Sequence, residues 1–165
     1  MEFPKRKPNR LKAYDYSSVG AYFITICTKN HITLLWEHTV GANCVRPSEK
    51  MHLSSVGMII ESEIQKINGV YPNVLVDKYV IMPNHIHFLI FILPDKDGRT
   101  QFAPTISRVM KQFKGSVTKK IGLPIWQKSF HDHIIRNEKE YQKIWEYIET
   151  NPLKWEEDCF YRQES

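Results

Sequence analysis

Residues 74–93 read VLVDKYVIMPNHIHFLIFIL, and the fold that we predict is built outward from this stretch. Two runs rich in apolar, β-branched and aromatic residues stand on either side of Met82-Pro83-Asn84, and such runs are typical of strands. The connection between them is short, which favours antiparallel pairing. We therefore expect a β-hairpin with strands at residues 74–81 and 85–93.

The second of these strands begins with two histidines on either side of Ile86. Alternate side chains of a strand point to opposite faces, so His85 and His87 should point the same way while Ile86 enters the core. Two imidazoles side by side can hold a divalent metal and leave positions open for a substrate. A His-x-His pair also arises by chance on ordinary strands, so the pair alone indicates either a metal site or half-buried strand residues.

The rest of the chain supplies further elements on both sides of the hairpin. Composition and apolar spacing predict where these strands and helices lie. In chain order these are a strand at 21–28, two short strands at 34–38 and 50–53, a helix at 54–69, the hairpin, a helix at 104–120, a strand at 130–136 and a helix at 138–150. The main elements follow the order of an α+β, ferredoxin-like (RRM-like) fold, with an antiparallel sheet, helices on one face and an added C-terminal helix.

Length and composition indicate one soluble domain. The 165 residues are 42% hydrophobic and 25% charged, and no linker divides them, so we expect a single domain over residues 1–165 with a basic arm at 1–14. The longest apolar runs are far shorter than the ~20 residues that cross a bilayer, and the charged N-terminus is not a signal peptide. We therefore expect a cytoplasmic protein without a membrane segment. The three cysteines form no Cys-x-x-Cys pair, which indicates reduced thiols.

The formal net charge of +5 is distributed unevenly. Residues 1–14 hold five Lys or Arg residues against one acid, and residues 98–128 hold seven with no acid. Two basic blocks suggest a polyanionic partner, although a basic tail and a solvated helix face look the same in a sequence. The candidate nucleic-acid-binding residues are Lys5, Arg6, Lys7, Arg108, Lys111, Lys114, Lys119 and Lys120, with Trp126 for base stacking.

A second group of polar residues ends the predicted C-terminal helix, in the stretch WEYIETNP at 145–152. Tyr147 and Asn151 are four residues apart and therefore lie on one face of that helix. Pro152 disfavours helical geometry at Asn151 and marks the helix end. Taken singly, Tyr147 is equally well an ordinary packed ring and Asn151 an ordinary C-terminal cap.

Together these motifs resemble the HUH single-tyrosine transposases, above all the REP-associated tyrosine transposases and related insertion-sequence transposases. The resemblance runs from about residue 22 to 152. It is carried by Pro-Asn-His-Ile-His on a central strand, Trp126-Gln127, Ile135-Arg136, and Tyr-Ile-x-x-Asn-Pro on the last helix.

The resemblance implies a role for each matching residue. His85, His87 and Asn151 are implied as ligands of Mg²⁺ or Mn²⁺, and Tyr147 as the nucleophile that forms a 5′-phosphotyrosine bond. The implied activity is metal-dependent nicking and joining of single-stranded DNA beside a hairpin, as in DNA transposition. The residue types agree, because a metal polarises a scissile phosphate and a phenol can attack it.

Other functions fit parts of the same pattern. A non-catalytic module that binds single-stranded nucleic acid would carry the aromatic RNP1 pattern, which is absent. A paired-histidine phosphoesterase would need another histidine in step, where Leu89 stands. A domesticated transposase that only binds DNA hairpins stays open as well, although the presence of all four site residues argues against decay. A homodimer in which the partner chain supplies the tyrosine also stays open. The second His-x-His pattern, at residues 131–133, is given no ligand role by the resemblance.

Overall fold

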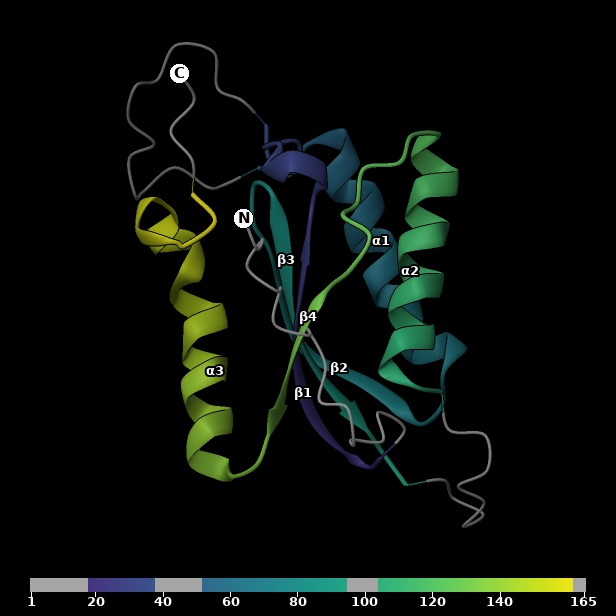
Figure 1. Ribbon diagram of the computed structural model, residues 1–165, viewed down its shortest axis with the longest axis vertical. Helices are drawn as coiled ribbons and strands as arrows, with labels where there is room; N and C mark the ends of the chain where they lie inside the picture. The colour runs from purple at the N-terminus through teal and green to yellow at the C-terminus, as the bar shows by residue number, and fades with distance from the viewer. Residues whose placement is uncertain (1–17, 38–51, 95–103, 162–165) are drawn as a thin grey trace, which may run out of the picture.

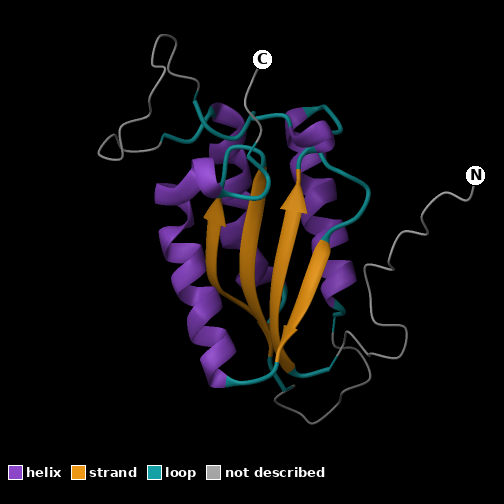
Figure 2. Cartoon of the chain, turned by 60° about the vertical axis from the view of Figure 1, so that its left-hand side comes forward, coloured by secondary structure: helices purple, strands orange, loops and turns teal. Residues whose placement is uncertain are grey.

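The computed structural model describes residues 18–37, 52–94 and 104–161, and these form a four-stranded antiparallel sheet with helices on both faces. The strand order is β2-β3-β1-β4. The elements are β1 (Gly20–Cys27), η1 (Lys29–His31), α1 (Ser55–Val70), β2 (Val74–Ile81), β3 (His85–Ile92), α2 (Ile106–Ile121), β4 (His131–Ile135), α3 (Glu138–Thr150) and η3 (Asn151–Glu157). Figures 1 and 2 show α1 and α2 on one face of the sheet and α3 on the other.

This arrangement confirms the predicted ferredoxin-like fold. The long strands and helices begin and end within a few residues of their predicted limits, and β2 and α3 match theirs. The predicted short hairpin is reduced to one bridge between Trp36 and Leu53, and residues 38–51 lie outside the described part of the chain. No helix in the described ranges has the length and apolar character needed to span a bilayer.

Strand β3 separates two apolar cores because its alternate side chains are buried on both faces. Ile86, Phe88 and Ile90 pack with the apolar sides of α1 and α2 in the larger core. Leu89, on the other face, packs with Ile148 of α3 in the smaller core. His85 and His87 lie on this α3 side, as the alternation along β3 predicts.

Local capping residues fix where the helices begin and end. The hydroxyl of Ser54 accepts a hydrogen bond from the backbone N–H of Gly57 at 3.1 Å, and Asn137 caps α3 by accepting from Glu140 N–H at 2.9 Å. Gly122 ends α2 with φ 79°, in the left-handed region that glycine adopts without strain.

Glu63 joins the two helices of the larger layer. Its buried carboxylate accepts hydrogen bonds from Lys66 at 2.6 Å and Lys120 at 2.7 Å, and from the hydroxyl of Ser116. The hydrogen bonds from Lys120, Lys66 and Ser116 lower the pKa of Glu63 from 4.5 to about 2. The folded state therefore favours the ionised carboxylate.

We expect Glu63→Gln to lower the free energy of unfolding by about 1–3 kcal/mol at pH 7, because charge-assisted hydrogen bonds are lost. The folded-state pKa is depressed, so the contribution of Glu63 is present above pH 4.5 and is lost as the pH falls toward 2. Urea unfolding of both proteins at pH 7 and pH 3 measures this. The exposed Glu146→Gln in α3 is the control, and equal effects of the two substitutions would contradict the role of Glu63.

Candidate active site

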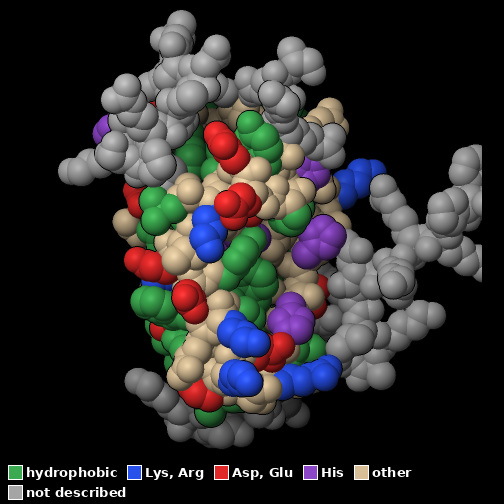
Figure 3. All heavy atoms as spheres, turned by 90° about the vertical axis from the view of Figure 1, so that its left-hand side faces the viewer, with side chains coloured by type: hydrophobic (Ala, Val, Ile, Leu, Met, Phe, Trp, Pro, Cys, Tyr) green, Lys and Arg blue, Asp and Glu red, His purple; other side chains and the backbone are tan. Residues whose placement is uncertain are grey.

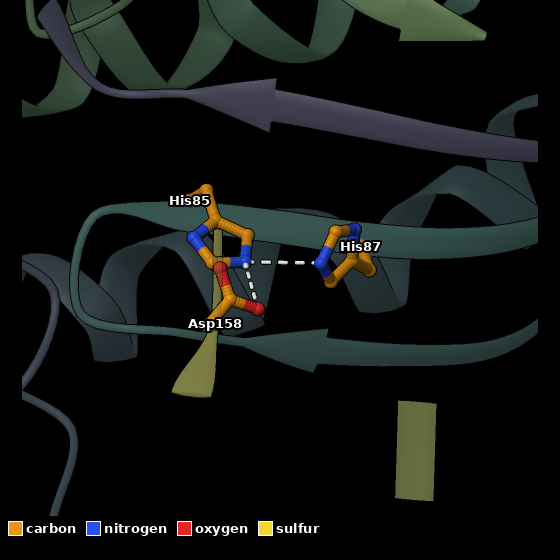
Figure 4. Close-up of side chains that lie close together, drawn as sticks. All are labelled: His85, His87 and Asp158. Carbon is orange, nitrogen blue, oxygen red and sulfur yellow. Dashed lines mark hydrogen bonds and ion pairs between the residues drawn. The ribbon is translucent and has the colours of Figure 1, made fainter. Parts of the chain in front are cut away.

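The two histidines at the start of β3 face each other beneath the end of α3. His85 and His87 are 0% and 2% exposed, and their Nε2 atoms lie 3.0 Å apart. Figure 4 shows both rings on the same side of the strand, with the side chain of Asp158 against His85. Two ring nitrogens and one carboxylate thus meet in one buried place.

Asn84 determines which nitrogen of His85 carries the proton. Its Nδ2 donates to the carbonyl oxygens of His31 at 3.2 Å and Phe160 at 2.9 Å, so its Oδ1 must be the atom that faces His85. The Nδ1–H of His85 donates to this Oδ1 at 2.8 Å. The Nε2 of neutral His85 therefore has a free lone pair directed at His87.

Thr25 of β1 is paired with His87 of β3 in the sheet, and its side chain contacts the His87 ring. Its Oγ1 lies 2.8 Å from His87 Nδ1. With the hydroxyl as acceptor, the Nε2 lone pair of His87 also points into the space between the rings. Such outer hydrogen bonds are the usual means of orienting imidazoles that bind a metal.

Burial keeps both imidazoles neutral. It lowers the pKa of His85 to about 3, with a further contribution from His31 nearby. The pKa of His87 is held well below its ordinary value by burial and by the adjacent His85. Neutral imidazole is the form that coordinates metals, so this pair is ready to bind a cation at neutral pH.

Tyr147 reaches the histidine pair from α3 of the same chain. Its hydroxyl lies 3.3 Å from His87 Nε2, and its ring packs against the imidazole with centroids 5.2 Å apart. The residue is still 39% exposed, so it stands between the buried pair and solvent. Burial of the phenol and the negative charge of Asp158 raise the pKa of Tyr147 above its ordinary value of 10.

Asn151 lies one turn beyond Tyr147 and is 3% exposed, and its buried Nδ2 has no hydrogen-bond partner. The predicted loss of helical geometry at this position is wrong, since Asn151 has φ −55° and ψ −43°. Pro152 ends the α-helical hydrogen bonding but occupies the first turn of η3, where its missing N–H costs nothing. The backbone therefore continues from α3 into η3 without an extended break. Residues 155–161, which follow, pass over the histidines.

That segment brings in a residue that the sequence analysis missed. The hydroxyl of Tyr147 donates to Asp158 Oδ2 at 3.2 Å, and the same oxygen lies 3.9 Å from His85 Nε2. Asp158 follows the predicted helix and has no fixed spacing to the other site residues. Only the path of the chain after Pro152 brings it to the site.

Aromatic side chains enclose the imidazoles. Phe23 stacks on His87 with centroids 5.0 Å apart, and Phe160 packs on His85 at 4.6 Å. The ring centroids of Trp155 and His85 lie 6.0 Å apart. In the described conformation these rings keep water away from the pair.

The basic residues predicted to bind DNA are not gathered around this site. Helix α2, which bears five of them, covers the face of the sheet opposite the histidines. Lys114 is half-buried and donates to the backbone oxygen of Gln127, while Lys120 pairs with Glu63. Arg108, Lys111 and Lys119 are exposed. The α3 face instead mixes acidic and basic side chains over its visible part (Figure 3).

The remaining predicted residues lie elsewhere. Trp126 is partly buried and packs on Phe113, with centroids 6.1 Å apart. Lys5, Arg6 and Lys7 lie outside the described residues. In the second His-x-His pattern His131 is paired in register with Thr25, while His133 contacts Glu140 at 2.7 Å.

Comparison with known proteins gives a relative over nearly the whole chain and named relatives over about half of it. An uncharacterized protein of Haemophilus influenzae is 35% identical over 175 residues, which cover 94% of this chain and 93% of that protein. The REP-associated tyrosine transposase of Escherichia coli strain K12 is 38% identical over 80 residues, 48% of this chain and 44% of that protein. No family model matches the chain.

A solved REP-associated tyrosine transposase, bound to a REP hairpin, has the same fold. It superposes with a TM-score of 0.63 and 24% identity, over 88% of this chain and 74% of that one. The ferredoxin-like sheet with its histidine pair and helix tyrosine matches the pattern described above for the HUH single-tyrosine transposases. The chain is thus similar to REP-associated tyrosine transposases in sequence over about half of its length and in fold over most of it.

We expect Asn84→Ala to lower the free energy of unfolding by about 2–4 kcal/mol, because it removes the three hydrogen bonds that this buried side chain makes to His31, Phe160 and His85. Urea unfolding measures the loss. Asn68→Ala is the matched control, since the Asn68 amide accepts one exposed hydrogen bond, from Val76 N–H, and its removal should cost less than about 1 kcal/mol. Similar losses in the two variants would contradict the role of Asn84.

Proposed function

We propose that this protein nicks and rejoins single-stranded DNA beside a hairpin, with Tyr147 as the nucleophile and a divalent metal at His85 and His87. The observation that carries the proposal is the 3.3 Å approach of the Tyr147 hydroxyl to His87 Nε2 within one chain. The named relative and the hairpin bound in the solved relative support the choice of substrate.

The ligand set fits Mg²⁺ or Mn²⁺. Neighbouring ligands of an octahedral ion with bonds of about 2.1 Å stand about 3 Å apart, and the two Nε2 atoms are 3.0 Å apart. Two lone pairs at this distance repel each other unless a proton or a cation lies between them. Asn151, whose side chain is buried one turn beyond Tyr147, would supply its amide oxygen as the third ligand.

Tyr147 would attack the scissile phosphate, so that its oxygen forms a bond to phosphorus while the bond from phosphorus to the 3′ oxygen breaks. The 5′ end stays on the tyrosine and the other strand leaves with a 3′-hydroxyl. When bound, the cation supplies positive charge to the phosphate oxygens and to the phenol, whose pKa is otherwise raised. Attack by a later 3′-hydroxyl reverses the step and rejoins the strand.

Arg108, Lys111 and Lys119 of α2 would bind phosphates of the hairpin. They are exposed, and residues 98–128 contain no acid. Their position behind the sheet suits a duplex stem that lies outside the reaction site. Lys114 and Lys120 would add charge while they hold their own structural contacts. Lys5, Arg6, Lys7 and Trp126 complete the proposed DNA-binding set.

A second candidate is binding of DNA hairpins without cleavage. It is favoured by the complete burial of His85 beneath residues 155–161, since a phosphate reaches the imidazoles only when these side chains withdraw. A test for the covalent intermediate separates the two functions.

We expect a DNA–protein adduct that survives denaturation when the protein is incubated with Mn²⁺ and labelled oligonucleotides that contain hairpins. Tyr147→Phe should abolish it, and His85→Ala should reduce it about 100-fold or more, because several kcal/mol of charge stabilisation are lost. Tyr141→Phe, on the same helix, is the control and should keep the adduct. An adduct formed by Tyr147→Phe, or the lack of one with the wild type, would overturn the cleavage proposal.

We expect Lys111→Ala with Lys119→Ala to weaken hairpin binding and to reduce the slope of log affinity against log salt by about 1 for each lysine. Fluorescence anisotropy measures this slope between about 50 and 200 mM salt, the range over which phosphate contacts weaken. The control is Lys139→Ala with Lys143→Ala on α3, which should leave the slope unchanged. The reverse result would place the hairpin on the α3 face.

A further inference from the structure

Residues 155–161 lie over the histidine pair and contribute their own polar group to it. The carbonyl of Phe160 accepts a hydrogen bond from Asn84, and the backbone N–H of Phe160 donates to Asp158 Oδ1 at 2.7 Å. These two contacts hold the backbone of Phe160 beside the Asp158 side chain, which is fully buried.

The Asp158 carboxylate converges on the same point as the two imidazoles. One oxygen, Oδ2, lies 3.9 Å from His85 Nε2, and the ligand atoms of His85, His87 and Asp158 all lie within 4.8 Å of one another (Figure 4). In the ranges that the structure describes, this is the one group of three His, Cys, Asp or Glu side chains with that property. Two histidines and a carboxylate with open positions are a common set for a divalent ion.

Among the residues that the structure describes, no Lys or Arg balances the charge of this carboxylate. Its donors are the Tyr147 hydroxyl and one backbone N–H, both neutral, and within the described residues no Lys or Arg forms an ion pair with it. A buried anion without a counter-charge is costly, and a cation between the three groups removes that cost.

We propose that Asp158 is the anionic ligand of the divalent ion held by His85 and His87, so that the metal joins the sheet to the C-terminal segment. This inference rests on the proposed function, which places the metal at the histidine pair. Asp158 adds the negative charge that two imidazoles and the Asn151 amide lack, and it holds the Tyr147 hydroxyl beside the ion through the 3.2 Å hydrogen bond.

Binding of Mn²⁺ alone, followed by the loss of its free-ion electron paramagnetic resonance signal, tests this ligand without any need for DNA or activity. Asp158→Asn keeps the size of the side chain and its hydrogen-bond acceptor but removes the charge. We expect it to weaken Mn²⁺ binding about tenfold or more, the scale on which even outer contacts act on metal affinity. Glu157→Gln removes an exposed neighbouring charge and should leave the affinity unchanged.

His85→Ala separates the possible outcomes. If His85→Ala weakens binding while Asp158→Asn binds as the wild type does, Asp158 is not a ligand and only this inference fails. If His85→Ala also binds as the wild type does, the metal site of the proposed function fails. Asp158→Ser replaces Asp158→Asn if circular dichroism shows the latter to be unfolded, and wild-type affinity of the serine variant equally overturns the proposal.

Discussion

The alternation of side chains along β3 is the constraint on which the rest of this structure depends. Because β3 is an inner strand with a helical layer on each face, every side chain from His85 to Leu89 is buried. One face supplies the larger apolar core with Ile86 and Phe88. The other must then bury two imidazoles, and their polar atoms can be accommodated only by exact partners. The fold and the site therefore share one strand, and a shift of its register by one residue would exchange them.

The partners of the imidazoles come from three separate parts of the chain. Thr25 is placed by the pairing of β1 with β3, Asn84 by the turn before β3, and Asp158 by the segment after η3. Each fixes one atom of the group, and together they leave the two Nε2 atoms and a carboxylate oxygen facing one another. Two imidazole nitrogens and a carboxylate packed this closely in a buried place need a proton or a cation between them.

The part of this site that periodicity governs could be predicted from the sequence. The strand alternation placed His85 and His87 on one face, and the spacing of four placed Tyr147 and Asn151 on one side of α3. The contacts of Thr25 needed the register between two strands that are far apart in sequence. Asp158 needed the course of the chain beyond Pro152, where the expected break in helical geometry does not occur. Counting charges found the basic helix but could not show that Lys114 and Lys120 are engaged in internal contacts.

If the histidine pair and Asp158 hold a metal as proposed, the position of Asp158 links metal binding to access. A carboxylate and a phosphate are both anions, and both are attracted to a cation at the histidine pair. The carboxylate is attached to a segment whose Phe160 and Trp155 rings cover the imidazoles, whereas a phosphate must come from solvent. Tyr147 is the one member of the group with a large exposed fraction, and its hydroxyl contacts both His87 and Asp158. A phosphate that approached over Tyr147 would therefore meet the proposed nucleophile first, and it would meet the proposed cation only as the aromatic cover yields.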